Sequence, residues 1–178
     1  MKSDSFFVIE NLNKRFGATI ANDDISLVIN KGEVRGFAGE NGSGKSTLCL
    51  IIGGIYQMDE GKMHKNGQLY TPASPIDANN QGVAMVVQEL GVLESLSVAE
   101  NIFLGKTEQF TNRGLLNNRK MNKAAEEHLR EWGIDDIPVD IKAGALSIEQ
   151  RKLVELVRAL SVDPDILILD EATSSVDT

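Results

Sequence analysis

The chain is poor in cysteine: of its 178 residues only one, Cys49, is a cysteine. A single cysteine cannot form a disulfide framework within the chain. A chain of this length buries roughly 70% of its unfolded surface on folding, so it needs neither disulfides nor a metal for stability. We therefore interpret Cys49 as a small core residue of a protein in a reducing compartment, with a reactive thiol as the alternative.

The chain also lacks a long apolar run and an excess of positive charge. No apolar stretch approaches the length that crosses a bilayer, and the segment 1–5 has no signal-peptide character, so we expect a cytosolic chain that does not itself span a membrane. Eighteen Lys and Arg stand against 26 Asp and Glu, a formal charge of −8, which argues against a dominant nucleic-acid-binding face. Hydrophobic content of 42% and charged content of 25% are ordinary for one globular domain, or most of one.

What the sequence does have is a glycine-rich segment that fits the phosphate-loop pattern G-x-x-x-x-G-K-[ST]. Its residues are Gly39, Glu40, Asn41, Gly42, Ser43, Gly44, Lys45, Ser46 and Thr47. An apolar run, Val34–Ala38, precedes the segment and predicts a buried strand, and Leu48–Ile52 predicts a helix after it. Glycines let the backbone wrap an anion, Lys45 adds a charge for the terminal phosphates, and Ser46 offers a hydroxyl to Mg²⁺. The alternative is a glycine-rich turn that binds no ligand.

The remaining pattern predicts an α/β fold. Continuous apolar strands alternate with helices, which indicates a mostly parallel core, and earlier polar-alternating strands suggest an antiparallel β subdomain beside it. We expect a hairpin turn at Asn66-Gly67 and a helix with a capping box opened by Ser97 and Glu100. The other expected strands are Phe6–Glu10, Ile25–Ile29, Lys62–Lys65, Val83–Val87 and Ile166–Leu169, and the other expected helices are Ile76–Asn80, Arg119–Trp132 and one capped by Ser147 with a stripe of Leu153, Leu156, Val157 and Leu160.

The strand Ile166–Leu169 ends in two acids, Asp170 and Glu171, which is a Walker B arrangement. A buried strand delivers the first carboxylate to a fixed point where it can hold Mg²⁺ directly or through water. The neighbouring Glu171 points differently and could polarise an attacking water as a general base. Many α/β strands end in an acid, so this signal gains its strength from the phosphate loop upstream.

Two polar segments between these motifs could also contact a nucleotide. Gln88 follows the strand Val83–Val87, and its amide could reach a metal or a water; alternatively it is a polar residue leaving a strand. The segment Leu146-Ser147-Ile148-Glu149-Gln150 opens a helix whose capping hydroxyl and amides could hold a phosphate, or it is a plain N-cap. Read alone, the segment 174–177 is a polar turn.

Taken in order, these segments resemble the ATP-binding-cassette (ABC) ATPases over essentially the whole chain. The order is phosphate loop, glutamine loop, Leu-Ser-x-x-Gln helix start, Walker B with Asp-Glu, and Ser-Ser-Val-Asp. Three further stretches resemble the ATPase subunits of bacterial monosaccharide importers: Val87–Leu90, Leu96–Gly105 and Gln150–Leu160. The resemblance implies one incomplete nucleotide-binding domain over residues 1–178, with a helical subdomain at about 89–160.

The resemblance also implies a role for each motif. Phe16 would stack on adenine, the alternative being core packing; Gly39–Thr47 would bind the phosphates of ATP; and Glu171 would be the catalytic base. Magnesium would be arranged by Ser46, Gln88 and Asp170. Ser147 and Gln150 would face the γ-phosphate of ATP on a second ABC domain, in tandem or in a homodimer, and Asp177 would lie in the loop that links the two sites. Further implied partners are a membrane permease and, indirectly, a solute-binding protein, which places the chain on the inner face of the membrane.

The sequence departs from the family pattern at three points. Ile148 and Glu149 replace the glycines of the commonest signature, and an extra carboxylate there should repel a γ-phosphate. Ala172 replaces the usual proline. The third departure is that the sequence ends at Thr178, before a histidine that contacts the γ-phosphate in the family, so we expect an incomplete cassette that hydrolyses ATP poorly by itself. Two other functions stay open: a soluble ABC-type ATPase in translation or DNA repair, and a non-catalytic nucleotide-binding module.

Overall fold

The computed structural model describes residues 5–86, 91–112 and 114–170. The chain divides into two compact units, Met1–Val83 and Ala84–Thr178. None of the helices in the described ranges is long and apolar enough to cross a bilayer.

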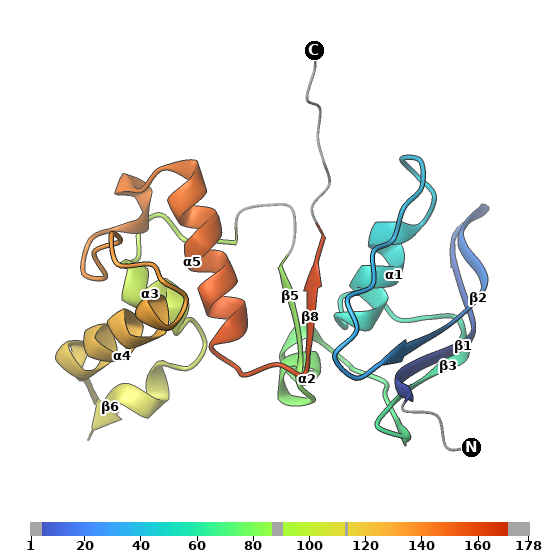
Figure 1. Cartoon of the computed structure of the whole chain (residues 1–178), viewed down its shortest axis with the longest axis horizontal. Helices are drawn as coiled ribbons and strands as arrows, with labels where there is room; N and C mark the ends of the chain where they lie inside the picture. The colour runs from blue at the N-terminus through green and yellow to red at the C-terminus, as the bar shows by residue number, and fades with distance from the viewer. Residues whose placement is uncertain (1–4, 87–90, 113, 171–178) are drawn as a thin grey trace, which may run out of the picture. The chain divides into compact units, whose positions relative to one another are not determined.

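The first unit is built on an antiparallel sheet (Figure 1). Its strands are β1 (Ser5–Phe16), β2 (Thr19–Asn30), β3 (Glu60–Lys65) and β4 (Gln68–Leu69), in the order β2-β1-β3-β4. The register of β1 against β2 shifts between Ile9 and Leu12, where Asn11 adopts a φ of 51°. A bulge changes which face the following side chains point to, and this one lets Ile9 and Leu12 both lie in the core. The predicted antiparallel strands and the Asn66-Gly67 turn are confirmed.

Two helices accompany this sheet. Helix α1 (Lys45–Ile52) follows the glycine-rich segment, as predicted, and Cys49 is buried on it. Helix α2 (Pro75–Asn80) begins after Ser74, whose side chain accepts a hydrogen bond from the backbone N–H of Asp77. The largest buried side chains of this unit come from the sheet, from α1 and from the segment after β4: Phe7, Ile9, Leu12, Ile51, Met63 and Tyr70.

Tyr70 joins the end of α1 to the sheet. Its hydroxyl donates a 2.7 Å hydrogen bond to the carbonyl of Ile52, and its ring meets Phe7 edge-on at 5.4 Å. Burial, and secondarily the charge of Asp77, raise the pKa of Tyr70 well above its usual range, so the hydroxyl stays a donor. A carbonyl at a helix C-terminus has no partner within its helix, which explains why this bond stabilises the unit.

We expect Tyr70→Phe to destabilise the chain by about 1 kcal/mol, because the ring contact survives and one buried hydrogen bond is lost. The measurement is the shift in urea unfolding midpoint. Tyr56→Phe is the matched control: this ring is 40% exposed, and we expect a change within about 0.5 kcal/mol. Equal losses of stability in the two variants would show that the hydrogen bond from the Tyr70 hydroxyl to Ile52 does not stabilise the unit.

The predicted buried strand Val34–Ala38 is wrong. These residues lie outside any strand, Val34 is 98% exposed and Phe37 is 38% exposed. A strand gains its stability from hydrogen bonds to a neighbour, and within the described residues no strand is paired with this run. The apolar composition therefore indicated a strand for which the described residues supply no pairing partner.

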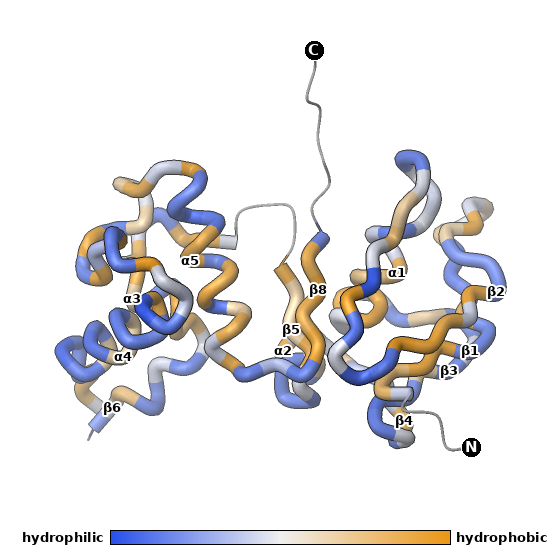
Figure 2. The backbone as a smooth tube through the Cα atoms, viewed as in Figure 1, coloured by the Kyte–Doolittle hydropathy of each residue, from blue (hydrophilic) through white to orange (hydrophobic). Residues whose placement is uncertain are grey.

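Two short strands form a separate sheet, β5 (Val83–Val86), which begins at the last residue of the first unit, with β8 (Ile166–Leu169) of the second. The N–H of Asp170 donates a 3.1 Å hydrogen bond to the carbonyl of Val86, so the C-terminal ends of the two strands meet. This pairing is parallel, as Figure 1 also shows, and agrees with the predicted parallel core. Strand β8 is apolar along its length (Figure 2) but half-buried rather than fully buried, and Leu169 is 57% exposed.

Helices form the rest of the second unit. They are α3 (Val98–Ile102), the 3₁₀ turn η1 (Thr107–Phe110), α4 (Asn118–Glu131), the 3₁₀ turn η2 (Ala143–Ala145) and α5 (Ile148–Leu160), with a small antiparallel hairpin of β6 (Thr111–Asn112) and β7 (Leu115–Leu116). Helices α3, α4 and α5 pack around one apolar core. Helix α4 is mostly hydrophilic (Figure 2), and its buried residues Met121, Ala125 and Leu129 lie along one face, which confirms the predicted amphipathic helix.

The predicted buried stripe on α5 is only partly right. Val157 is buried, but Leu153 is 37% exposed and Leu156 and Leu160 are half-buried. Val154 and the charged residue Glu155 are buried in their place. The periodicity was correctly helical, but the buried face of the helix is centred on Val154 and Val157, which belong to the apolar core, and Leu153 lies outside it.

Candidate functional site

The glycine-rich segment forms a loop that leads directly into α1. Gly44 adopts a φ of 87° and ends the loop as the N-cap of the helix. A Cβ atom at this position would lie 2.1 Å from the carbonyl oxygen of Ala21, so both the backbone angle and the close approach of β2 require glycine. No side chain caps α1, and its first N–H groups are the type of donors that bind anions.

Lys45 folds back over this loop. Its ammonium group donates hydrogen bonds of 2.8 Å to the carbonyls of Gly39 and Glu40 and lies 3.3 Å from the hydroxyl of Ser43. A Cβ on Gly39 would lie 2.8 Å from that hydroxyl, so this glycine leaves the room that the arrangement needs. The residues present therefore fit a phosphate: glycines open the backbone and a cation lies over it.

Asn22 on β2 lies beneath the loop and was missed by the sequence reasoning. Its side-chain amide donates a 3.2 Å hydrogen bond to the carbonyl of Gly44, and the residue is 5% exposed. Its other side-chain atom, Oδ1, has no hydrogen-bond partner among the described residues. Nothing in the local sequence pattern distinguishes Asn22 from a surface residue of a strand, so only the packing of β2 against the loop identifies it.

Phe16 ends β1 with a ring that is 43% exposed. It meets the ring of Tyr56 edge-on at 5.2 Å, and the ammonium group of Lys14 lies 5.3 Å from its centre. A fully packed core position is excluded by this exposure. The accessible part of the ring leaves room for a planar ligand, so stacking on adenine stays a prediction.

The predicted cap at Ser147 is confirmed. Its hydroxyl accepts from the N–H of Gln150 at 3.2 Å, and the side-chain oxygen of Gln150 accepts from the N–H of Ser147 at 3.1 Å, a reciprocal capping box. The same hydroxyl donates to Glu149 at 2.8 Å, and this bond is the main reason that the pKa of Glu149 lies below its usual range. Glu149 is therefore charged at neutral pH at the exposed start of α5. Contact of Ser147 and Gln150 with a γ-phosphate stays a prediction.

Asp170 directly follows β8, as predicted, where its N–H joins the two parallel strands and its side chain is half-buried. Gln88, Glu171 and Asp177 lie outside the described residues. The phosphate loop belongs to the first unit, whereas Asp170, Ser147 and Gln150 belong to the second. Their convergence on one magnesium-bound nucleotide stays a prediction, and the described ranges contain no group of three or more His, Cys, Asp or Glu side chains that could hold a metal by themselves.

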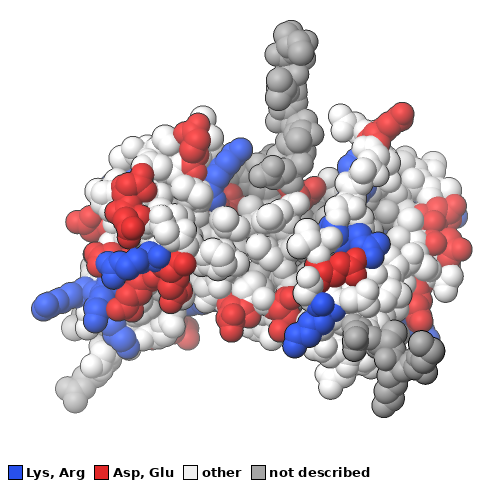
Figure 3. Space-filling view, in the orientation of Figure 1, with Lys and Arg blue, Asp and Glu red and all other residues white. Residues whose placement is uncertain are grey.

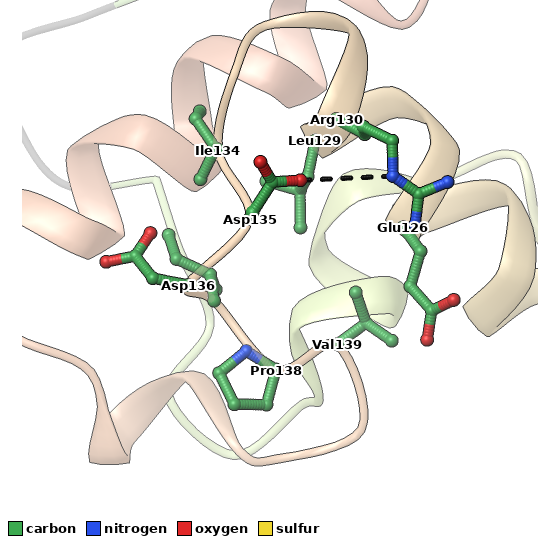
Figure 4. A pocket seen from close by; sticks show the side chains of 9 residues that line it. Glu126, Leu129, Arg130, Ile134, Asp135, Asp136, Pro138 and Val139 are labelled. Atoms are coloured by element: carbon green, nitrogen blue, oxygen red, sulfur yellow. Dashed lines mark ion pairs between the residues drawn. The ribbon is translucent and has the colours of Figure 1, made fainter.

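A pocket of about 250 Å³ lies where α4 ends and the following loop begins (Figure 4). Apolar and acidic side chains line it, and Arg130 faces Asp135 across 3.9 Å. None of the predicted site residues lines this pocket. On the face drawn in Figure 3, acidic and basic side chains are interspersed over the described residues, without a broad patch of one sign.

The chain matches a known protein family and several known proteins. Residues 22–174 match the family model described as ABC transporter. The chain is 39% identical over 168 residues to the ribose import ATP-binding protein RbsA of Shouchella clausii, covering 94% of this chain and 34% of that protein. It is 40% identical over 166 residues to a putative ribose/galactose/methyl galactoside import ATP-binding protein of Pseudomonas fluorescens, covering 93% of this chain and 32% of that protein. The chain thus spans about a third of the length of the curated relatives it matches.

Solved structures give the same answer for the fold. The ADP conformation of an ATP-binding cassette of an ABC transporter matches with a TM-score of 0.80 at 31% identity, over 98% of this chain and 71% of that one. A nucleotide-free cassette from an ABC transporter matches with a TM-score of 0.77 at 30% identity, over 97% of this chain and 71% of that one. The predicted α/β fold of the P-loop ATPases is confirmed, and the chain belongs to the ABC transporter family.

Proposed function

We propose that this chain binds ATP and takes part in its hydrolysis, and that hydrolysis drives the import of a solute, most simply a monosaccharide. The observation that carries the proposal is the loop Gly39–Thr47, in which the half-buried Lys45 lies over a glycine-opened backbone at a helix N-terminus. Family membership supports ATP as the anion, and the names of the sugar-import relatives support the direction and the class of solute. These names favour import over an ABC-type role in translation or DNA repair.

Each site residue has a role in this proposal. Lys45 and the amides at the start of α1 hold the β- and γ-phosphates, and the exposed ring of Phe16 stacks on adenine. Ser46, Asp170 and Gln88 are the residues that would hold Mg²⁺, whose charge neutralises the developing charge on the phosphate oxygens. Glu171 orients and deprotonates the attacking water. Positioning and electrostatic stabilisation supply most of the acceleration in such a transfer.

The partners follow from the same proposal. Ser147 and Gln150, at the start of α5, would face ATP bound to a second ABC domain, in tandem or in a homodimer. The transporter would also contain a membrane permease, served by a solute-binding protein, so the chain would lie at the cytoplasmic face of the membrane. Co-purification of the complete protein with a permease supports this assignment, whereas co-purification with ribosomes would contradict it.

Lys45→Ala tests nucleotide binding. We expect the affinity for ATP to fall roughly 10- to 100-fold, since a charged hydrogen bond contributes about 1.5–3 kcal/mol. The measurement is isothermal titration of the complete protein with Mg-ATP. Lys31→Ala, which removes the same charge from an exposed turn of the same unit, is the matched control and should bind like the wild type. Equal affinity of the Lys45 variant and the control would contradict the proposal.

A further inference from the structure

The backbone of Gly91 is bound at both of its polar groups by one turn of α5. The N–H of Gly91 donates to Oε1 of Glu155 at 3.3 Å, and Nη1 of Arg158 donates to the carbonyl of Gly91 at 2.6 Å. Arg158 and Glu155 also pair with each other, with 3.5 Å between Nη2 and Oε1. The three residues form a closed set of contacts between segments 64 to 67 residues apart in the sequence.

The glycine is needed for this approach. A Cβ at residue 91 would lie 2.6 Å from Nη2 of Arg158 and 3.0 Å from Oε1 of Glu155, so any other residue would push the pair away from the backbone. The two helix side chains in this contact are largely shielded from solvent: Glu155 is only 4% exposed and Arg158 is 25% exposed.

Burial of this pair is not an efficient way to stabilise a helix bundle. Burial raises the pKa of Glu155, while the attraction of Arg158 and the bond from Gly91 lower it. The cost of taking two charges out of water often equals or exceeds what their attraction returns, and apolar residues of similar size commonly stabilise as well. The presence of a buried ion pair bonded to the backbone of Gly91 is therefore better explained by the fixed position that it gives to this segment than by its contribution to stability.

A second contact on the same face of α5 holds the same segment. Arg151 is bonded to the carboxylate of Glu94 and donates a 2.9 Å hydrogen bond to the carbonyl of Gly144. Arg151, Glu155 and Arg158 are spaced at i, i+4 and i+7, which places them along one side of the helix. Helix α5 thus carries a polar edge that binds the segment Gly91–Glu94 along two turns.

We propose that Glu155 and Arg158 are positioning residues for ATP hydrolysis: they fix Gly91 to α5, so that the segment Gly91–Glu94 and the helix start at Ser147 and Gln150 keep one spacing. Neither side chain contacts nucleotide in this proposal. The inference rests on the proposed function, because its consequence is a rate of ATP hydrolysis.

The test compares Glu155→Gln, Arg158→Gln, Arg158→Lys and the wild type in the complete protein. We expect Arg158→Gln to lower kcat for ATP about 10- to 100-fold, since small displacements of catalytic groups have effects of this size. The KM for ATP should stay within about twofold, because the phosphate loop lies in the other unit and is unchanged. Glu155→Gln keeps an acceptor for the N–H of Gly91, so its kcat should fall less than that of Arg158→Gln. Arg158→Lys keeps a cation and a donor, so its kcat should lie between those of Arg158→Gln and the wild type.

The control is Val157→Ala on the same helix. Val157 is 1% exposed and makes no polar contact with Gly91. Its truncation therefore destabilises the unit by leaving a cavity, without removing the contacts of Glu155 and Arg158 with Gly91. We expect wild-type kcat from this variant after matching for the folded fraction. An equal fall of kcat in Val157→Ala and Arg158→Gln, or wild-type kcat in Arg158→Gln, would overturn the proposal.

Hydrogen exchange separates a failure of this proposal from a failure of the proposed function. In Glu155→Leu the Gly91 amide loses its acceptor, and we expect its exchange to accelerate at least about tenfold, whereas that amide in Val157→Ala should accelerate no more than its neighbours. If the Gly91 amide stays equally protected, Glu155 does not hold Gly91 on α5, and the proposal is contradicted whatever the rate of ATP hydrolysis. A wild-type protein that binds no Mg-ATP would overturn the proposed function and the catalytic consequence, while the exchange experiment still decides the structural part.

Discussion

The variant Asn101→Asp should destabilise the helical unit by about 3 kcal/mol or more at neutral pH, the largest loss of stability that we expect from a single isosteric change. Asn101 is fully buried and its oxygen accepts from the N–H of Leu93 at 2.7 Å. Its amide nitrogen faces three backbone carbonyls, those of Leu93, Leu96 and Ser97, at 3.0, 3.4 and 2.9 Å. A carboxylate oxygen in place of that nitrogen would face three acceptors without a donor.

The loss should depend on pH in a defined direction. Burial and the facing carbonyls raise the folded-state pKa of the new carboxyl above its unfolded value of about 4, because they disfavour its charged form. A group with a raised folded-state pKa stabilises most below its unfolded pKa and loses that contribution as pH rises. The deficit relative to wild type should therefore be smallest near pH 4 and grow toward pH 7.

Urea unfolding at several pH values measures this deficit. Asn118→Asp, the same chemical change at an exposed position in the first turn of α4, is the control and should shift stability by less than about 0.5 kcal/mol. A deficit that stays constant between pH 4 and 7 would show that the buried charge is not its cause.

The second large effect concerns the rate of ATP hydrolysis. We expect Glu171→Gln in the complete protein to lower phosphate release by about 10²- to 10³-fold while leaving ATP binding unchanged, because glutamine fills the same volume but cannot accept the proton of the attacking water. Binding should survive because, in the proposed function, the loop Gly39–Thr47 binds the phosphates without residue 171. The two measurements are steady-state phosphate release and titration with Mg-ATP.

A matched acid on the surface gives the control for this variant. Glu127 lies on α4 in an exposed ion pair with Lys123, and Glu127→Gln removes the same charge without touching a predicted site residue. Its phosphate release should equal that of the wild type. If the turnover of Glu171→Gln stays within tenfold of the wild-type turnover, Glu171 is not the general base.

Local sequence signals predicted the helix starts well. Ser97 with Glu100 and Ser147 with Gln150 each form the reciprocal cap that their spacing indicates. The motif around Lys45 likewise fixed both the loop and the helix after it. Such features involve side chains and N–H groups within one turn, so their geometry is set by residues that are adjacent in the sequence.

Features that depend on distant partners could not be predicted in this way. The apolar run Val34–Ala38 has the composition of a buried strand, but no pairing partner is supplied for it among the described residues. Glu155 reads as a solvated position on a helix, yet Gly91 and Arg158 make it a buried one. Asn22 and Asn101 are also recognisable only from the backbone groups that surround them. In each of these cases tertiary contacts overrode the local pattern.

The folded-back position of Lys45 affects how much a nucleotide can gain from it. The ammonium group already directs its three N–H groups at the carbonyls of Gly39 and Glu40 and the hydroxyl of Ser43, so each hydrogen bond to a phosphate, as proposed, would replace one inside the loop. The loop therefore acts as an intramolecular competitor, and the calorimetric enthalpy of binding should be smaller than a count of new contacts suggests. The released carbonyls must then turn to water, so solvent composition should influence the affinity of this chain for phosphates.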